Sequence, residues 1–233
     1  MTHILAIDTS TDACSVAILT PSHVQQTLIV APREHTQRLL PSIESLLAEH
    51  ELCLQQFDAI AFGVGPGSFT GLRIALSTAQ GLAYGADLPL IPISTLETMA
   101  HTALRAGLVK EGQTVIPVID ARMNEVYWSA YQYTQQEQLW HTLQEETIAA
   151  PEIVAANSLL QPQNEIVAIG SGWHYACLSQ CLSQPAHIEV YPEAYDMSVL
   201  AKHAWDTQGS DATISPLSAV PTYMRNEISW KKR

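Results

Sequence analysis

Two polar segments of this chain carry residue types that bind phosphate or metal ions. Asp8, Thr9, Ser10 and Thr11 place a carboxylate and three hydroxyls in a tight turn, which suits Mg²⁺ or water beside a phosphate. A second segment, 63–73, has glycines at 63, 65, 67 and 71 before a predicted helix, and amides at a helix start bind anions. No lysine follows these glycines, and their spacing misses GxGxxG by one residue. We interpret 63–73 as a close-packed turn, while nucleotide binding at residues 8–11 and a turn-capping role for Asp8 both stay open.

Other catalytic chemistry finds less support. No two of the nine histidines are four residues apart, so the sequence lacks the paired ligands of a helical metal site, and His101 is expected to be a solvated or hydrogen-bonded residue. Ser68 is outside any GxSxG motif and is expected to cap the following helix. The four cysteines form no CxxC motif, and we expect reduced thiols in or near the core. The sequence therefore predicts no catalytic residue and no metal site.

Composition limits the partners of the chain. The 233 residues are 47% hydrophobic and 15% charged, which is typical of a folded protein, and the net charge of −12 disfavours direct binding of nucleic acid. The one basic cluster is the tail 230–233. No apolar run reaches the roughly 18 residues of a membrane helix, and no signal peptide is evident at the N-terminus, so a cytoplasmic protein is expected.

The first hundred residues alternate between strand-like and helix-like patterns, which predicts an α/β fold. Leucine and isoleucine spacing indicates a helix over 35–50, with Pro41 either in its first turn or forcing a later start. The other elements are predicted as strands at 3–8, 14–18, 24–30, 58–64 and 88–93, with helices at 68–84 and 94–104.

The second half repeats this order. The strand 115–120 matches 4–8 when Asp120 is aligned with Asp8, a shift of 112 residues, and the strand after it matches as well. A third strand is predicted at 138–148, and another at 166–169 precedes Gly170, Ser171, Gly172 and a helix. We therefore expect two tightly packed lobes, 1–104 and 105–233, and leave open whether the C-terminal segment returns to the first lobe.

The two long helices of the first lobe carry more apolar surface than a sheet is expected to cover. Small residues let a second helix approach closely, so we predict a partner-binding face on the helices 35–50 and 68–84. Arg73 would anchor it through a bidentate ion pair or lie in solvent. The predicted interface residues are Leu39, Leu40, Ile43, Leu46, Leu47, Gly71, Leu72, Arg73, Ala75, Leu76, Thr78, Ala79 and Leu82.

Five segments together resemble the bacterial TsaB (YeaZ) family of the actin-like ATPase superfamily. They are ILAIDTST at 4–11, HTQRLLP at 35–41, GPGSFTGLRI at 65–74, VIDAR at 118–122 and PTYMR at 221–225. The resemblance implies a duplicated ribonuclease-H-like fold. It also implies a non-catalytic subunit that forms N6-threonylcarbamoyladenosine at tRNA position 37 together with its catalytic paralogue TsaD and the ATPase TsaE.

The resemblance also implies how the chain assembles. A heterodimer with TsaD is expected, a homodimer when the chain is alone, and tRNA contact only through the complex. No cofactor is expected in the chain itself, although ATP or ADP with Mg²⁺ at the complex interface stays open. The HxxxH of TsaD falls on Thr95 and Met99, which do not replace imidazoles. The alternative hypotheses are an ATP-binding or ATP-hydrolysing protein and a glycoprotease-like hydrolase that acts on its own.

Overall fold

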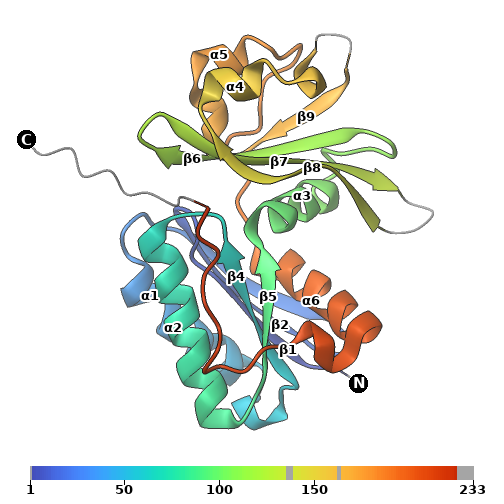
Figure 1. Ribbon diagram of the computed structural model, residues 1–233. Coiled ribbons are helices and arrows are strands. Elements are labelled where there is room, and N and C mark those ends of the chain that lie inside the picture. Colours follow the sequence, from blue (N-terminus) through green and yellow to red (C-terminus); the bar gives the residue numbers. More distant parts are fainter. Residues whose placement is uncertain (1, 135–138, 162–163, 225–233) are drawn as a thin grey trace, which may run out of the picture.

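The computed structural model describes residues 2–134, 139–161 and 164–224 and shows two lobes, each built on one mixed sheet (Figure 1). The first lobe contains β1 (Ile4–Asp8), β2 (Ala13–Leu19), β3 (Val24–Val30), α1 (His35–Glu49), β4 (Ala59–Gly65), α2 (Phe69–Ala86) and β5 (Leu90–Ser94). The second contains β6 (Thr114–Arg122), β7 (Glu125–Thr134), β8 (Leu139–Ala149), α4 (Pro151–Ala155), β9 (Ile166–Ile169) and α5 (Ala176–Ser179). Two further helices, α3 (Thr95–Arg105) and α6 (Ala194–Gln208), pack against each other between the sheets.

The two sheets share one topology. The first has the order β3-β2-β1-β4-β5 and the second has the order β8-β7-β6-β9. In both, the first three strands in sequence are antiparallel neighbours, and the next strand pairs in parallel with the first. This repeated order confirms the predicted duplicated ribonuclease-H-like fold.

Helices cover both faces of each sheet. In the first lobe, α1 and α2 pack on one face and α6 packs on the other, so every residue of β1 and β2 is buried. In the second lobe, α3 covers one face, and α4 and α5 cover the other. No helix in the described part of the chain is long and apolar enough to cross a membrane.

The internal alignment of the two halves is one residue off in the first strand of each lobe. Ile7 pairs with Val16 in the core beneath α1 and α2, and Val118 pairs with Trp128 in the core beneath α4 and α5. Ile7 therefore corresponds to Val118, and Asp8, the next residue, corresponds to Ile119. Asp120 lies one position further along and is not the counterpart of Asp8.

One local prediction was also wrong, and two elements differ from what the sequence indicated. Pro41 lies in the second turn of α1, on its exposed side, where the packing of the buried side holds the helix together despite the lost backbone donor. The helix predicted after the glycines at 170 and 172 is present but short: a 3₁₀ turn, Ser171–His174, leads into the four-residue α5. α6 had no predicted counterpart, because its buried side relies on small residues and a buried aspartate rather than a leucine stripe. Gln138, the predicted start of β8, lies outside the described residues.

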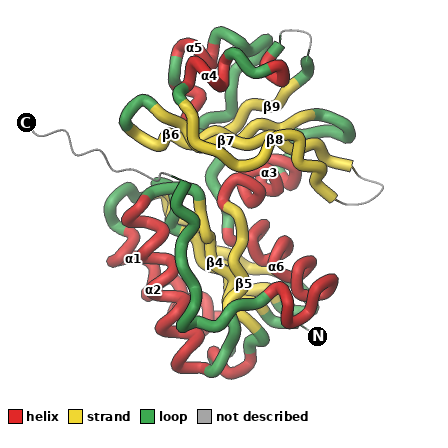
Figure 2. The backbone as a smooth tube through the Cα atoms, viewed as in Figure 1, coloured by secondary structure: helices red, strands yellow, loops and turns green. Residues whose placement is uncertain are grey.

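The division of the chain after residue 104 stays a prediction, and elements pack across it in both directions. α3, from the first half, forms one side of the second lobe's core. α6, from the second half, packs on β1 and β2. The loop segment after α6 then runs beside α2 (Figure 2).

Candidate functional site

Asp8, the residue that a ligand-binding turn would use, is completely buried. Its Oδ1 accepts hydrogen bonds from the backbone amide of Ser10 (2.9 Å) and from the Ser10 hydroxyl (2.8 Å). Its Oδ2 has no partner among the described residues and faces Gly63, where a side chain would overlap it. Burial raises the pKa of Asp8 to about 7, because the loss of hydration outweighs both hydrogen bonds. The carboxyl group therefore points into the protein rather than toward a ligand.

The glycine loop closes over this turn. The amide of Ser68 donates to the carbonyl of Ser10 (2.7 Å), and the hydroxyl of Thr9 donates to the carbonyl of Gly71 (2.7 Å). A Cβ at Gly71 would overlap the carbonyl oxygen of Thr9, and a Cβ at Gly67 would lie 2.5 Å from that of Ser10. The glycines thus serve close packing of α2 on the turn, as the interpretation of 63–73 required. Ser68 caps α2 by accepting the amide of Gly71, as predicted.

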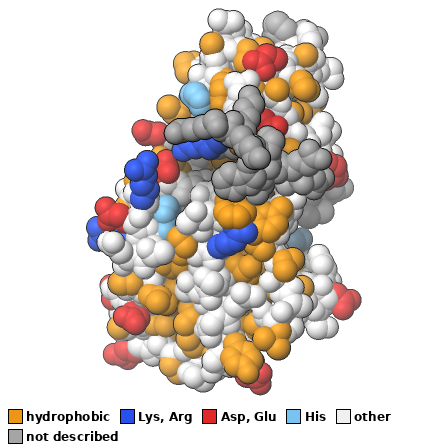
Figure 3. All heavy atoms as spheres, turned by 60° about the vertical axis from the view of Figure 1, so that its left-hand side comes forward, with side chains coloured by type: hydrophobic (Ala, Val, Ile, Leu, Met, Phe, Trp, Pro, Cys, Tyr) orange, Lys and Arg blue, Asp and Glu red, His pale blue; other side chains and the backbone are white. Residues whose placement is uncertain are grey.

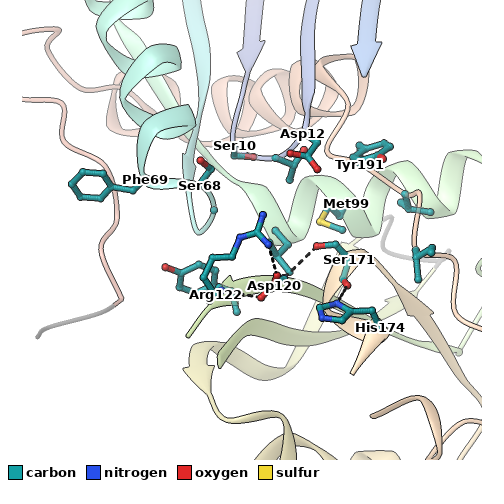
Figure 4. Close-up of a pocket in the computed structure, with 17 residues that line it drawn as sticks. Ser10, Asp12, Ser68, Phe69, Met99, Asp120, Arg122, Ser171, His174 and Tyr191 are labelled. Atoms are coloured by element: carbon teal, nitrogen blue, oxygen red, sulfur yellow. Dashed lines mark hydrogen bonds and ion pairs between the residues drawn. The ribbon is translucent and has the colours of Figure 1, made fainter. Parts of the chain in front are cut away.

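An open cleft of about 480 Å³ lies between this turn and the second lobe (Figure 4). Of the predicted ligand-binding residues, Ser10 and Thr11 reach its wall, while Asp8 and Thr9 lie beneath it. On the opposite wall, the Asp120 carboxylate accepts hydrogen bonds from the amide of Arg122 (2.9 Å) and from its guanidinium (3.0 Å). The guanidinium is thereby already matched by a carboxylate, and the described lining contains no lysine, so the cleft lacks a cationic cradle for phosphates.

The described residues show no group of three metal-ligating side chains. Thr95 and Met99 are buried in α3, where Met99 packs in the core beneath the second sheet. His101 lies 3.5 Å from the carboxylate of Asp196, a structural contact between α3 and α6. None of these side chains is placed for metal or nucleophilic chemistry.

Most of the predicted interface residues are internal to the lobe, and this corrects the prediction. The helices turn their small and large apolar side chains toward their own sheet, because both packing helices must approach the strands closely. The buried set is Leu39, Ile43, Leu46, Gly71, Leu72, Ala75, Leu76 and Ala79. A charge at Ala75, which is fully buried, would therefore disrupt the core and would not test an interface.

The remaining predicted interface residues stay at or near the surface. Leu40 is 47% exposed on α1, Arg73 is exposed on α2, and Leu47, Thr78 and Leu82 are partly buried. Outside this set, the aromatic side chains of Phe69 and Tyr84 on α2 are also exposed. Figure 3 shows that hydrophobic side chains gather on this side of the molecule. We define the α1–α2 face as the exposed side chains of these two helices.

The cysteines are free thiols. Cys14 is buried beside the Asp8 turn, and burial together with the Asp8 charge raises the pKa of its thiol to about 11. Cys177 and Cys181 are partly buried at the second core, whereas Cys53 is exposed, contrary to the prediction for all four.

Comparison with known proteins identifies the family. The family model described as TsaD, tRNA N6-adenosine threonylcarbamoyltransferase, matches residues 27–189. The tRNA threonylcarbamoyladenosine biosynthesis protein TsaB of Escherichia coli K12 is 42% identical over 98% of this chain and 97% of its own length. The chain belongs to the TsaB family. The TsaB protein of Haemophilus influenzae is 41% identical over 98% of this chain and 96% of its own length.

Solved structures agree with this assignment and confirm the resemblance drawn from the sequence motifs. YeaZ from Pseudomonas aeruginosa is 37% identical, with a TM-score of 0.81 over 96% of this chain and all of the other. A second structure from that organism, described as an uncharacterized protein with similarity to peptidase YEAZ, has a TM-score of 0.82 over 97% of this chain. The TsaB assignment therefore rests on both sequence and structure.

Proposed function

We propose that this member of the TsaB family takes part in forming N6-threonylcarbamoyladenosine at position 37 of tRNA in the cytoplasm, as a non-catalytic partner of a TsaD-type transferase. Its relatives in Escherichia coli and Haemophilus influenzae, both named as tRNA threonylcarbamoyladenosine biosynthesis proteins, support this pathway. The observation that supports the non-catalytic role is the burial of Asp8: its carboxylate oxygen without a described partner faces Gly63 in the interior, and the glycine loop packs against the turn at Thr9 and Ser10. A turn with this buried carboxylate does not support an independent ATPase or hydrolase activity.

The proposed assembly uses the α1–α2 face. The match of residues 27–189 to the TsaD family model indicates that the two proteins share this part of the fold, so like faces of two paralogues can pair isologously. We propose a heterodimer with TsaD, a weaker homodimer of the chain alone and participation of a TsaE-type ATPase in the complex. The net charge of −12 favours tRNA contact through the partners. No cofactor is assigned to this chain, and a nucleotide with Mg²⁺ at the complex interface remains part of the hypothesis.

Reconstitution of tRNA modification tests the function. Unmodified tRNA and threonylcarbamoyl adenylate are supplied to purified TsaD-type and TsaE-type partners, with or without this chain. We expect modification to depend on the chain, and equal rates without it would reject the proposal. Turnover of ATP or cleavage of a peptide by the isolated chain would instead support one of the enzymatic alternatives.

A matched pair of surface variants tests the face. Leu40→Glu places a charge on the exposed side of α1, where it should abolish co-elution with the TsaD-type partner while the monomer stays folded. Ile153→Glu changes a residue that is 67% exposed on α4 of the second lobe and should leave co-elution unchanged. Co-elution of Leu40→Glu at the level of wild type would contradict the assignment of the α1–α2 face.

A further inference from the structure

The segment after the C-terminal helix forms a strap, residues 214–224, along α2. Its first residue, Ile214, exchanges two backbone hydrogen bonds with Leu90 at the edge of the sheet (2.8 and 3.0 Å). The side-chain amide of Gln80 donates to two strap carbonyls, and the amide of Thr222 donates to the carbonyl of Val64 (2.9 Å). Ala219 is buried in the first core. The strap is therefore fixed at both ends and at its centre.

The strap brings an aromatic ring to the start of α2. The guanidinium carbon of Arg73 lies 3.2 Å from the centroid of the Phe69 ring and 5.2 Å from that of Tyr223, and the two rings are 5.7 Å apart. Phe69 is 54% exposed and Tyr223 is 46% exposed. We call these three residues the anchor cluster. Stacking on the rings holds the guanidinium in one orientation before any partner arrives.

The guanidinium of Arg73 in the anchor cluster has no carboxylate as an ion-pair partner among the described residues. Among the described residues, Arg73 forms no ion pair, and its one protein hydrogen bond runs to the carbonyl of Phe69 (3.4 Å). At the residue before α1, the Glu34 carboxylate forms an ion pair with Arg38 at 2.7 Å. The guanidinium edge is thus left to bind an acidic group from outside the chain.

Exposed apolar side chains continue from the anchor cluster along the strap and α2. Leu217 and Val220 on the strap are 82% and 69% exposed, and Tyr84 further along α2 is 71% exposed. Tyrosine and arginine are enriched among the residues that contribute most to binding at protein interfaces. The cluster also adjoins the α1–α2 face, since Phe69 and Arg73 belong to α2.

We infer that the anchor cluster binds a carboxylate side chain within an apolar segment of the TsaD-type partner, and that the strap forms part of that interface. This inference rests on the proposed function. The partner's carboxylate forms a bidentate pair with Arg73, while its apolar neighbours cover Phe69, Val220 and Tyr223.

Titration calorimetry of the full chain with the purified TsaD-type partner tests this assignment. Arg73→Ala should weaken binding by about 30-fold or more, the loss typical of an interface hot spot. Arg73→Lys should restore only part of the affinity, because an ammonium group neither stacks nor forms the bidentate pair. Tyr223→Ala should also weaken binding, and Ile153→Glu should bind as wild type does. Unchanged circular dichroism and melting temperature would show that the variants remain folded.

The outcomes separate this inference from the proposed function. Failure of the wild-type chain to bind the TsaD-type partner would contradict the proposed function itself. Loss of binding in Leu40→Glu, with Arg73→Ala within twofold of wild type, would keep the α1–α2 face and overturn the anchor cluster. The inference would also be overturned if Arg73→Ala weakened only the homodimer, or only tRNA binding.

Discussion

The buried carboxyl group of Asp8 makes a strong prediction about stability. In the unfolded chain Asp8 ionises near 3.8, whereas in the folded chain burial raises its pKa to about 7. The folded state therefore binds one more proton than the unfolded state between these values, so the free energy of unfolding falls as the pH rises through this window. The shift of about 3 pH units corresponds to about 4 kcal/mol, most of it lost by pH 7, and the loss levels off as the pH rises above the folded-state pKa.

Asp8→Asn removes this titration while keeping the shape of the side chain. The amide oxygen can still accept both hydrogen bonds from Ser10. The amide nitrogen replaces a protonated Oδ2 that is itself without a partner, so the two side chains carry a similar desolvation cost at low pH. The variant should therefore match wild type near pH 4 and exceed it by up to about 4 kcal/mol at pH 7.

Urea denaturation followed by circular dichroism between pH 4 and pH 8 measures this difference. Asp12→Asn is the matched control, because Asp12 is an exposed carboxylate in the same turn. Its unfolding free energy should run parallel to that of wild type. A constant offset between Asp8→Asn and wild type across the range would refute the reasoning, since it would mean that Asp8 is ionised in the folded chain.

Two further predictions concern packing and charge. Gly71→Ala should lower the free energy of unfolding, measured by urea denaturation, by about 3 kcal/mol, because the new methyl group overlaps a carbonyl oxygen of the neighbouring turn. Gly81→Ala, at an open position of the same helix, should raise the free energy of unfolding by about 0.5 kcal/mol. Equal effects would contradict the packing role. Arg105→Met should cost about 3 kcal/mol, because it removes the guanidinium from the fully buried Asp196 and leaves that carboxylate only the Thr102 hydroxyl and the nearby His101, while Arg38→Met, in an exposed pair, should cost under about 1 kcal/mol. A loss as small as that of Arg38→Met would show that Thr102 and His101 suffice to stabilise Asp196.

The sequence predicted the positions of helices and strands better than it predicted which side of each one is buried. Apolar runs and helical spacing located every strand and the helices α1, α2 and α3, since those patterns are local. The side of α2 that is buried is not determined by local sequence, because it depends on packing against distant parts of the chain. Ala75 and Ala79 suit a helix–helix interface and a close approach to a sheet equally well, and in the structure they pack against the sheet. The same limit explains the one-residue error at Asp120, because side chains alternate across a strand and a single slip reverses the face.

The return of the C-terminal segment to the first lobe was an open alternative, but the course of the strap could not be derived from the sequence. Its contacts with α2 and β4 join residues more than 130 positions apart, such as Gln80 with the carbonyls of Pro216 and Ala219. The segment 221–225 was conspicuous only as a family motif. Nothing in its composition indicates that Tyr223 stacks near Arg73.

The glycine loop links the buried Asp8 turn to the proposed partnership. Because Gly67 and Gly71 let α2 press against the Asp8 turn, the start of the helix is fixed by the bonds from Ser68 to Ser10 and from Thr9 to Gly71. That contact fills the space in which a ligand would reach the carboxylate. It also sets the direction of the first turn of α2, whose outward side presents the aromatic and basic side chains of the anchor cluster. A substitution at these glycines should therefore impair partner binding and folding together, whereas a change at the anchor cluster should impair binding alone.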